Sequence, residues 1–411
     1  MARSVPVAVV GGGPAGLLAA EVLASEGDDL DVTVHERMRS PGRKLQLAGR
    51  GGLNLTHTEP LEVFLERYGP AQRALEPAIR AFPPGALRAW TGGLGQRAVV
   101  GTSGRVFPEA FRATPLLRAW LARLDGLGVT IRTRRTWQGW TDDGGLRFAG
   151  PDGSTDVVHA DATVLALGGA SWPGTGSDGG WVGALTATGV DVAPLRAANS
   201  GLDVDLTDHL RQRFAGTPLK NIGLRCGRTS VRGEAILTRT GLEGGAVYAI
   251  GRAVRDELDR RGRRGARLHL DLRPDLDEDE LAHRLATRRR SRDSASTGLR
   301  RAVGLPPVAV ALLRDCAPDA ALPTAPAALA RRIKDVELRV TGTEPLARAI
   351  STAGGIALGE VDERFMLRRR PGTFVAGEML DWDAPTGGYL LQATCSTAVA
   401  AARGVLAWLT P

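Results

Sequence analysis

The feature that most constrains this chain is a glycine-rich turn close to its N-terminus. The apolar run VAVV has the composition of a buried parallel strand. Gly11, Gly13 and Gly16 follow it in the spacing G-x-G-x-x-G, and Pro14 and Ala15 open a predicted helix. The first glycine permits a tight turn, the second lets backbone approach a pyrophosphate, and the third lets helix and strand pack closely. The helix N-terminus presents free N–H groups to the phosphates. This unit predicts dinucleotide binding.

A second strand and an acidic residue extend the unit. We expect the helix to end at Gly27, a typical C-cap, and DVTVHE to form the next strand with Glu36 at its end. Glu36 follows Gly16 by 20 residues, the separation at which an acid accepts hydrogen bonds from ribose hydroxyls. Because a carboxylate there disfavours a 2′-phosphate, NAD and FAD remain as candidates and NADP does not. The alternative is an ordinary α/β protein with a glycine-rich turn.

The length and composition are those of a globular protein with two or more domains. The chain has 411 residues, of which 43% are hydrophobic and 24% charged. No apolar run reaches the roughly 18 residues of a membrane-spanning helix, and the first strand begins near residue 5 without a signal peptide, so we expect a cytoplasmic protein. Cys226, Cys316 and Cys395 are far apart without a C-x-x-C spacing, which predicts neither a disulfide framework nor a metal site.

Positive charge is the unusual element of the composition. The formal net charge is +8, and the chain has only three lysines, Lys44, Lys220 and Lys334. A basic surface is a property of nucleic-acid-binding proteins, but a preference for arginine on solvated faces explains it equally well. Because arginine and lysine are not equivalent where a compact ammonium is needed, we expect a local role for the lysines, above all Lys44.

Residues 40–60 form a predicted loop that begins directly after the nucleotide-binding unit. A loop of this length inside a compact domain is usually functional. Arg43, Lys44 and Arg50 can neutralise phosphate. Asn54 and Thr56 can hydrogen-bond a polar ligand edge. His57 is the only side chain of this loop that ordinarily titrates near neutral pH, which makes it a candidate for catalysis, although a lone histidine is more often structural.

Helices and then strands are predicted over the next hundred residues. Residues 61–125 are expected to be mainly helical, with one helix starting at Thr114-Pro115. Alternating polarity and the turns DDGG and PDG then predict a β-meander. It ends in the buried strand ATVLALGG, whose Gly168 and Gly169 mark a second close approach of backbone to the ligand.

Beyond residue 194 the pattern changes and predicts an inserted domain. We expect residues 1–194 and 344–411 to form the two parts of the nucleotide-binding domain and residues 195–343 to form the insertion. Strands open the insertion, a helix begins at a glycine and covers residues 244–258, and the arginine-rich residues 252–301 are predicted to be helical.

The segment GEMLDWDAPTGGYLLQ favours FAD over NAD. TFVAGEMLD predicts a final strand with Glu378 and Asp381 at its C-terminal end, the edge where ligands bind in open α/β sheets, and an acid there can hold ribityl hydroxyls. Gly387-Gly388 then begins a helix whose N-terminus can stabilise an anionic reduced flavin. A flavin must be held far from the first βαβ unit, which an NAD dehydrogenase does not require. A plain strand–turn–helix that closes the sheet is the alternative.

Six motifs are distributed between Gly11 and Gln392, namely GGGPAG, GRKLQLAGRGGLNLTH, ALGGASWPGTGS, PLKNIGL, STAGGI and GEMLDWDAPTGGYLLQ. Together they resemble the YhiN-like bacterial FAD-dependent flavoproteins, which include aminoacetone-oxidase-like and bile-acid-reductase-like members. The resemblance implies an α/β fold with a Rossmann-type FAD-binding domain of the two-dinucleotide-binding type and an inserted β-barrel plus helical domain. Many relatives have Gly-Arg-Cys-Asn in place of Gly52-Leu53-Asn54 and Gly-Tyr-Asn in place of Tyr389-Leu390, so their substrates do not transfer to this chain.

The resemblance also implies contacts along the FAD. They are a pyrophosphate cradle of Gly11, Gly13, Pro14, Ala15 and Gly16, ribose contacts from Glu36 and Arg37, contacts along the cofactor from Lys44, Asn54 and Thr56, backing by Gly168 and Gly169, ribityl contacts from Gly377, Glu378 and Asp381, and cover for the ring from Gly387, Gly388, Tyr389, Leu390 and Leu391.

These features favour an FAD-dependent oxidoreductase that transfers a hydride between a small-molecule substrate and flavin N5. Tyr389, His57 and Glu378 are the candidates for moving a proton or orienting the substrate. The chain has no second G-x-G-x-x-G, and NAD(P)H stays open as a partner, so oxidase and reductase both remain. The alternatives are a non-catalytic flavin sensor and an RNA-linked flavoprotein that uses Arg288–Arg290 and Arg292, although the interleaved acids DLDEDE argue against nucleic acid. The sequence does not indicate an oligomeric state.

Overall fold

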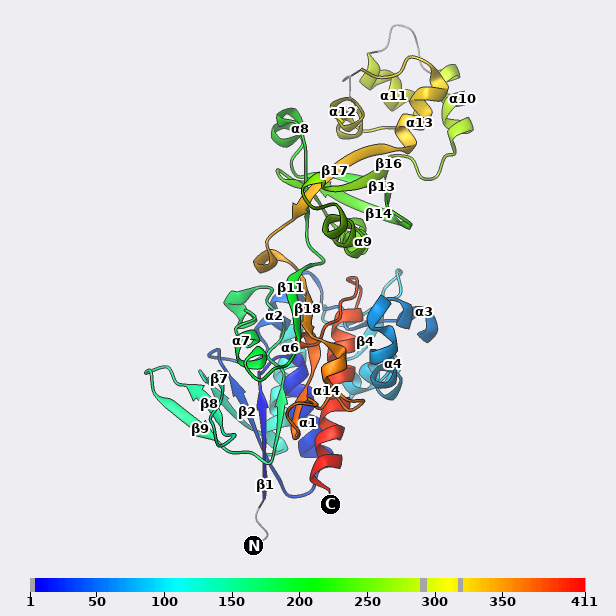
Figure 1. Ribbon diagram of the computed structural model, residues 1–411. Helices are drawn as coiled ribbons and strands as arrows, with labels where there is room; N and C mark the ends of the chain where they lie inside the picture. Colours follow the sequence, from blue (N-terminus) through cyan, green and yellow to red (C-terminus); the bar gives the residue numbers. More distant parts are fainter. Residues whose placement is uncertain (1–3, 289–293, 317–320, 411) are drawn as a thin grey trace. The chain divides into compact units, whose positions relative to one another are not determined.

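The computed structural model describes residues 4–288, 294–316 and 321–410, and the chain divides into two compact units (Figure 1). Unit 1 is built from Met1–Arg196 and Ile350–Pro411, and unit 2 from Ala197–Ala349. Each unit has its own hydrophobic core. The divisions lie a few residues beyond those expected at 194 and 343. One reason is that β11 (Val192–Ala198), which pairs with β18 (Ser351–Ile356), continues past the expected boundary.

A parallel sheet with the strand order β19-β10-β1-β2-β6 forms the centre of unit 1. Its strands are β19 (Thr373–Val375), β10 (Ala162–Leu165), β1 (Val5–Val10), β2 (Leu30–Glu36) and β6 (Thr130–Thr133). β1 lies between β10 and β2, and its apolar residues are buried, as expected for a central parallel strand. Because the strands are parallel, their carboxyl ends share one edge of the sheet, which is where ligands bind in such folds.

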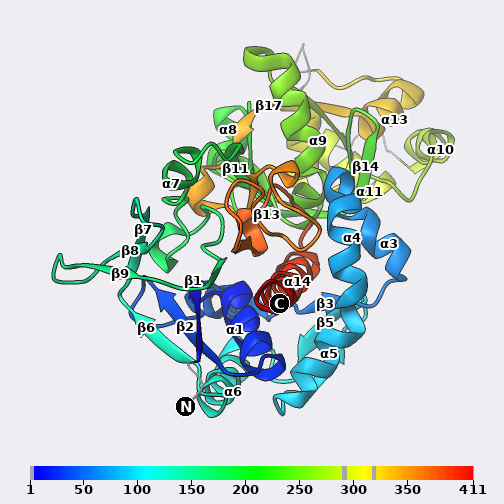
Figure 2. The ribbon, with the colours of Figure 1, turned by 60° about the horizontal axis from the view of Figure 1, so that its bottom comes forward.

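Two helices lie side by side in this unit, as Figures 1 and 2 show. α1 (Pro14–Glu26) starts after Gly13 and ends at Gly27, as predicted. α14 (Tyr389–Leu409) starts after Gly388 and also contacts β10 and β19. The first and last segments of the chain therefore build one layer against the sheet.

By length and composition alone, α14 is the one helix among the described residues that could cross a membrane, although polar residues and Arg403 interrupt its apolar sequence. Most of the helix is buried within unit 1, and Gln392 and Ser396 donate hydrogen bonds to the Phe82 carbonyl oxygen at 2.7 and 2.8 Å. Buried polar side chains that bind a neighbouring loop are typical of the core helix of a globular protein.

The predicted loop at residues 40–60 is partly regular. It contains α2 (Arg43–Ala48), a 3-10 turn (Gly49–Gly51) and the short strand β3 (Thr56–His57). β3 pairs with β5 (Arg105–Pro108), which pairs with β4 (Ala98–Val100). A strand of two residues cannot be recognised from periodicity, because only its partner stabilises it.

The helices that follow in unit 1 are α3 (Leu61–Glu66), α4 (Gln72–Ala81), α5 (Pro84–Gly93), α6 (Ala113–Gly126) and α7 (Val182–Thr186). α6 begins at Ala113 after Arg112, so Thr114-Pro115 lies inside its first turn and not at the predicted cap. A proline in the first turn is tolerated because its missing N–H would have no intrahelical partner.

The predicted β-meander is shorter than expected. Only β7 (Thr136–Trp140), β8 (Leu146–Ala149) and β9 (Thr155–Val158) form it. β6 before it and β10 after it join the parallel sheet instead, on two different strands. Sequence polarity cannot distinguish these two kinds of strand when they follow one another along the chain.

Unit 2 is a closed barrel with additional helices, as the family resemblance implied. The barrel strands, in spatial order, are β12 (Leu202–Val204), β15 (Gly241–Glu243), β14 (Thr229–Leu237), β13 (Thr217–Cys226), β16 (Ala266–Asp271) and β17 (Val336–Thr343). The helices are α8 (Asp208–Arg213), α9 (Gly245–Arg261), α10 (Glu278–Arg288), α11 (Ala295–Val303), α12 (Pro307–Asp315) and α13 (Pro326–Lys334). The glycine-started helix is α9. The helical prediction for residues 252–301 is interrupted by β16, and Arg289, Arg290 and Arg292 lie outside the described residues.

Candidate functional site

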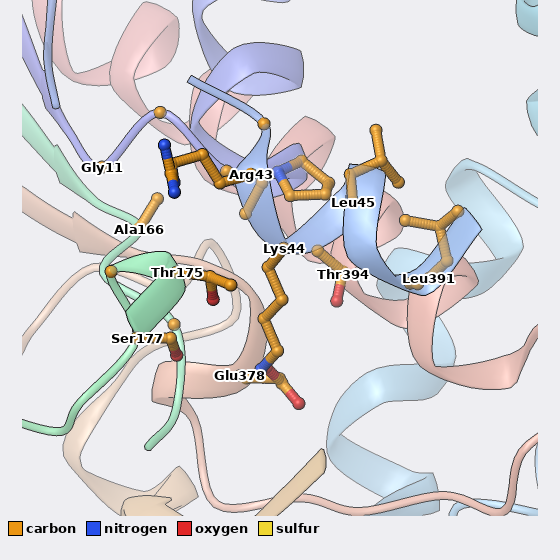
Figure 3. Close-up of a pocket in the computed structure, with 18 of the residues that line it drawn as sticks. Gly11, Arg43, Lys44, Leu45, Ala166, Thr175, Ser177, Glu378, Leu391 and Thr394 are labelled. Atoms are coloured by element: carbon orange, nitrogen blue, oxygen red, sulfur yellow. The ribbon is translucent and has the colours of Figure 1, made fainter. Parts of the chain in front are cut away.

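A cavity of about 640 Å³ lies in unit 1 at the carboxyl edge of the parallel sheet. Its volume is within the range of small-molecule sites. Its walls come from the turn after β1, the end of β2, α2, β5, the loop after β10 and the start of α14. Figure 3 shows side chains from several of these segments around the same space. Both ends of the chain therefore contribute to one site, as the sequence predicted for a dinucleotide.

The glycine turn has the geometry that the spacing predicted. Gly11 has a φ of +110°, and a Cβ on it would lie 2.3 Å from the Ala166 carbonyl oxygen. A Cβ on Gly16 would lie 1.8 Å from the Gly11 carbonyl oxygen, so this glycine packs α1 against the turn. A Cβ on Gly13 would meet nothing within 4 Å, and this residue lines the cavity. The first and third glycines thus shape the turn, and the second leaves space for a ligand.

Glu36 is fixed at the end of β2 by two backbone groups. Its Oε2 accepts from Gly12 N–H at 2.7 Å, and its Oε1 accepts from Met38 N–H at 2.6 Å. Burial raises the pKa of this carboxyl, and the two N–H groups oppose that shift because they stabilise the anion. The next residue, Arg37, pairs with Asp178 at 2.7 Å. A carboxylate held in this way keeps lone pairs free for a ribose hydroxyl.

Lys44 joins two segments that are 334 residues apart in the sequence. Its Nζ lies 2.6 Å from Glu378 Oε2 and 2.8 Å from Ser171 Oγ. Figure 3 shows the lysine extending from α2 toward Glu378. Both ionised side chains are largely buried, with exposed fractions of 24% and 15%. The lysine that the composition singled out therefore has a local partner, a carboxylate in the wall of the same cavity.

Arg43 provides a test of whether the site fits a dinucleotide diphosphate. Its Nε is buried and has no hydrogen-bond partner among the residues that the structure describes. The side chain lines the cavity near Gly11 (Figure 3). A buried donor without a partner is costly and points to a missing acceptor. Together with the open face at Gly13 and the start of α1, it fits a pyrophosphate.

Fourteen of the predicted cofactor-binding residues line the cavity. They are Gly11, Gly13, Pro14, Ala15, Glu36, Arg37, Lys44, Asn54, Gly168, Glu378, Gly387, Gly388, Leu390 and Leu391. Six others, Gly16, Thr56, Gly169, Gly377, Asp381 and Tyr389, are outside the lining, as is the catalytic candidate His57.

Several residues outside the lining support the backbone around the site. A Cβ on Gly388, at a φ of +98°, would lie 2.5 Å from backbone atoms of Thr56, so β3 packs directly on the start of α14. Thr56 Oγ1 donates to Gln392 at 2.8 Å. Gly377 N–H donates to Thr397 at 3.0 Å. These contacts fix the segments that carry lining residues.

Asp381 and Gly169, which were expected to contact the ligand, have protein groups close to them instead. Asp381 N–H donates to the Ile356 carbonyl oxygen at 2.9 Å, and burial, together with nearby Asp383, raises the pKa of its carboxyl. A Cβ on Gly169 would lie 2.3 Å from Thr352 Oγ1. Glu378, three residues before Asp381, is the acid of this segment that lines the cavity.

Tyr389 and His57 form a cluster behind the start of α14. The Tyr389 hydroxyl donates to Glu59 at 2.7 Å, and its ring stacks on His57 with 5.6 Å between centroids. Burial and the Glu59 carboxylate raise the pKa of this hydroxyl. His57 Nε2 lies 2.9 Å from the Ser103 carbonyl oxygen, and Arg67 pairs with Glu59 at 2.7 Å. Of the three catalytic candidates, only Glu378 lines the cavity.

Sequence reasoning missed His35, which lies in the lining beside Glu36. It is 1% exposed and stacks on Phe148 with 4.3 Å between ring centroids. Burial, followed by the nearby Arg135 and Arg132, lowers the pKa of this imidazole to about 4. Neither ring nitrogen has a hydrogen-bond partner among the described residues. A histidine next to the predicted ribose-binding acid at the end of a parallel strand was the available signal.

A second group of lining residues that the sequence did not indicate comes from the segment after β6, the loop after β10 and the neighbourhood of β5. They include Arg135, Trp137, Ser177, Arg105 and Phe107. Ser177 is the last residue of the motif ALGGASWPGTGS, whereas the other four residues belong to none of the six motifs, and only the fold brings them to the cavity.

Comparison with known proteins gives the same picture of the fold. The sequence profile of the HI0933-like protein Rossmann domain family matches residues 5–404. The chain belongs to this family. The assignment agrees with the resemblance to the YhiN-like flavoproteins, and it covers both units.

Two curated relatives and one solved structure illustrate the range of similar proteins. A 3-dehydro-bile acid delta(4,6)-reductase from Clostridium scindens is 24% identical over 97% of this chain and 98% of its own. A ribosomal RNA dihydrouridine synthase from Escherichia coli is 28% identical over 61% of this chain and 62% of its own. The structure of 3-ketosteroid delta1-dehydrogenase from Sterolibacterium denitrificans aligns with 98% of this chain and 99% of its own, with a TM-score of 0.55 and 14% identity, which shows a common fold.

Proposed function

We propose that this protein is an FAD-dependent oxidoreductase that reduces a carbon–carbon double bond conjugated to a carbonyl group. The observation that carries the proposal is the single cavity that extends from Gly13 and Glu36 to Gly388 and Leu391. A site with a phosphate-binding turn at one place and a helix start at another suits a dinucleotide that carries a reactive ring. When bound, FAD supplies a hydride at N5.

The residues of the chain have distinct tasks in this proposal. Glu36 accepts from the adenosine ribose, and Arg43 and the start of α1 bind the pyrophosphate. The Lys44–Glu378 pair presents carboxylate oxygens and an ammonium to the ribityl chain. Gly388 allows α14 to begin at the cavity, where its free N–H groups favour negative charge on the ring. Glu378, which both lines the cavity and binds a proton donor, is the proton-moving candidate among the three predicted residues.

The names of the two relatives support a class of reaction for this chain, but they do not supply its particular substrate. One name describes a reductase of double bonds in a 3-dehydro-bile acid, and the other describes the conversion of uridine to dihydrouridine. Both reactions add two hydrogens to a ring double bond. A hydride adds to one carbon of the bond and a proton to its neighbour, while the flavin is oxidised and a donor such as NAD(P)H reduces it again. The shared chemistry supports reduction of a conjugated ring double bond.

The visible spectrum of the purified protein tests the cofactor. We expect a flavin spectrum and release of FAD on denaturation, and a colourless protein that FAD cannot reconstitute would refute the proposal. Anaerobic addition of NADH or NADPH tests the donor, and dithionite reduces the flavin independently of it. A conjugated cyclic ketone should then reoxidise the reduced protein. If no donor or substrate changes the redox state of the bound flavin, a non-catalytic flavin sensor becomes the better account.

The distribution of charge favours RNA as a second candidate substrate. Unit 2 has 28 lysine and arginine residues against 20 aspartate and glutamate residues, whereas unit 1 has 25 of each. The whole net charge of +8 therefore belongs to unit 2. An excess of positive charge on one unit is the electrostatic pattern of nucleic-acid binding, and one relative is named for its action on ribosomal RNA.

Binding of a ribosomal RNA fragment at two salt concentrations tests this candidate. If unit 2 binds the phosphate backbone, affinity should fall about 10³-fold or more between 50 and 200 mM salt. Arg228→Gln and Arg239→Gln, at exposed turns of unit 2, should weaken binding, and Arg88→Gln, on an exposed site of unit 1, should not. If the RNA fragment binds weakly and its affinity is the same for the wild type and all three variants, RNA is excluded as the substrate.

A further inference from the structure

Five basic side chains line the cavity, namely Arg37, Arg43, Lys44, Arg105 and Arg135. Arg37 pairs with Asp178, Lys44 with Glu378, and Arg135 with Asp156. In the part of the chain that the structure describes, the guanidinium groups of Arg43 and Arg105 form no ion pair or hydrogen bond. Arg43 still interacts electrostatically with the Glu36 carboxylate, whose pKa it helps to lower against the effect of burial, whereas Arg105 is an exposed side chain in the cavity wall.

The two unpaired arginines lie on different segments. Arg43 begins α2 and lies near Gly11, where a pyrophosphate would take it up (Figure 3). Arg105 begins β5, whose Val106 accepts from Leu55 N–H at 2.8 Å and pairs with Thr56. Since Thr56 packs on Gly388, β5 is the strand next to the one that contacts the start of α14, while Glu36 marks the adenosine part of the cavity. The pyrophosphate therefore leaves Arg105 unused, beside the segment assigned to the flavin ring.

An aromatic pair accompanies Arg105. Phe107 lines the cavity, and its ring lies 5.3 Å from that of Phe111 at an interplanar angle of 31°. Gly52 lines the cavity next to them, and a Cβ on it would lie 3.6 Å from Phe107 and 3.9 Å from Phe111. Because Gly52 has no side chain, the two rings are not covered from that direction.

Phe111 has an exposed side chain and an unfavourable backbone conformation. It is 52% exposed, and its backbone has a φ of +52°, a left-handed conformation that is uncommon for a bulky residue. Phe111 N–H donates to the Pro108 carbonyl oxygen at 2.7 Å, and its own carbonyl oxygen accepts from Leu53 N–H at 3.4 Å. Strained backbone conformations cluster at ligand-binding sites, and Phe111, although outside the lining itself, lies beside the lining residue Phe107.

We propose that Arg105, Phe107 and Phe111 form the substrate subsite, in which the aromatic pair stacks on a flat, unsaturated ring and the guanidinium donates to its conjugated carbonyl oxygen. This inference rests on the proposed function. A cation at the carbonyl oxygen draws electron density from the distant carbon of the double bond and stabilises the negative charge that develops on the oxygen when hydride adds. The proton then joins the carbon next to the carbonyl group.

Two sources supply such a ring, a free cyclic enone and a uracil base in RNA. The test therefore uses a 3-oxo-Δ4-steroid and a uridine-containing oligonucleotide as probes of the oxidised holoenzyme without an electron donor. Binding is followed by the change in the absorption of the bound flavin. If the variants described below raise the Kd of the steroid, the subsite binds a free ring. If they raise the Kd of the oligonucleotide, the subsite binds a base.

Three variants test the subsite against a matched control. We expect Arg105→Met to raise the Kd of the probe about tenfold, because a charge-assisted hydrogen bond is lost. Phe111→Ala should raise it about fivefold through loss of ring stacking, and Phe107→Leu should act in the same direction. Val100→Ala, an exposed apolar residue on β4 outside the lining, should leave the Kd unchanged. All four proteins should retain the same amount of FAD.

The outcomes separate this inference from the proposed function. A wild-type protein that holds no FAD refutes the proposed function itself. Variants that retain FAD and bind the probes as the wild type does refute only the subsite. Loss of FAD from Arg105→Met would assign this arginine to the cofactor, against the inference, and failure of both probes to bind wild-type holoenzyme would refute the substrate class.

Discussion

Replacement of His35 by phenylalanine should remove a large part of the acid sensitivity of unit 1. The imidazole is 1% exposed and its ring nitrogens have no partner among the described residues. Phenylalanine can keep the stacking on Phe148 without leaving a polar atom unpaired. At pH 7 we therefore expect the free energy of unfolding of the variant to lie within about 1 kcal/mol of the wild-type value.

The magnitude follows from the pKa of the histidine in the two states. Burial lowers the pKa in the folded protein to about 4, from the ordinary value of 6.5 in the unfolded chain. Between these values the unfolded state binds more protons, so the stability contributed by the neutral imidazole is present above pH 6.5 and is lost as the pH falls toward 4. At about 1.4 kcal/mol per pKa unit, the wild type should lose about 3 kcal/mol relative to the variant between pH 7 and pH 4.

Urea unfolding of the cofactor-free protein, followed by tryptophan fluorescence at several pH values, measures this difference. Other groups titrate equally in both proteins and cancel in the comparison. A difference in unfolding free energy that stays constant between pH 7 and pH 4 would refute the reasoning. So would an NMR titration in which His35 of the folded protein gains its proton near pH 6.5.

Three further substitutions test the site. Gly11→Ala should abolish retention of FAD, measured by absorbance, because its Cβ would lie 2.3 Å from a carbonyl oxygen, whereas Gly85→Ala, whose Cβ would meet nothing within 4 Å, should not. Lys44→Met should lower the free energy of unfolding by about 3 kcal/mol, because it leaves the Glu378 carboxylate without its cation. The double variant Lys44→Met/Glu378→Gln should recover most of this loss. If the single and the double variant lost the same free energy of unfolding, a direct pairing would be contradicted. Tyr389→Phe should cost about 1 kcal/mol through its lost hydrogen bond to a carboxylate, and an unchanged Tm would argue against that bond.

Part of the site could be predicted from local spacing because the function of each residue there depends on its immediate neighbours. Gly11, Gly13 and Gly16 lie in one turn and the start of the helix that follows it. Glu36 is the last residue of the unit, after a helix and a strand of ordinary length. The same holds for Gly388, which must precede a helix that starts at the site. When a ligand binds at the ends of helices and strands, the residues that contact it therefore occur at fixed spacings in the sequence.

Other contacts required the folded chain. The sequence marked both Lys44 and Glu378 as ligand contacts, but their pairing across 334 residues appears only when α2 and the turn after β19 meet at the cavity. Tyr389 and His57 were candidates for catalysis, and the fold places them against Glu59 and Ser103 behind the start of α14. The polarity of a residue does not indicate whether its side chain at the start of a helix will face the cavity or the neighbouring protein segments.

By itself, the sequence determined that this protein has a Rossmann-type unit, an inserted domain and a final segment that returns to that unit. Local conformational requirements of glycine, helix ends and buried strands are sufficient for these conclusions. Only the tertiary structure decided that the ring nitrogens of His35 are buried without a hydrogen-bond partner among the described residues and that Arg105 and Phe107 border the cavity. These properties depend on strands that are distant in sequence and become neighbours through burial and pairing, which no short window of residues specifies.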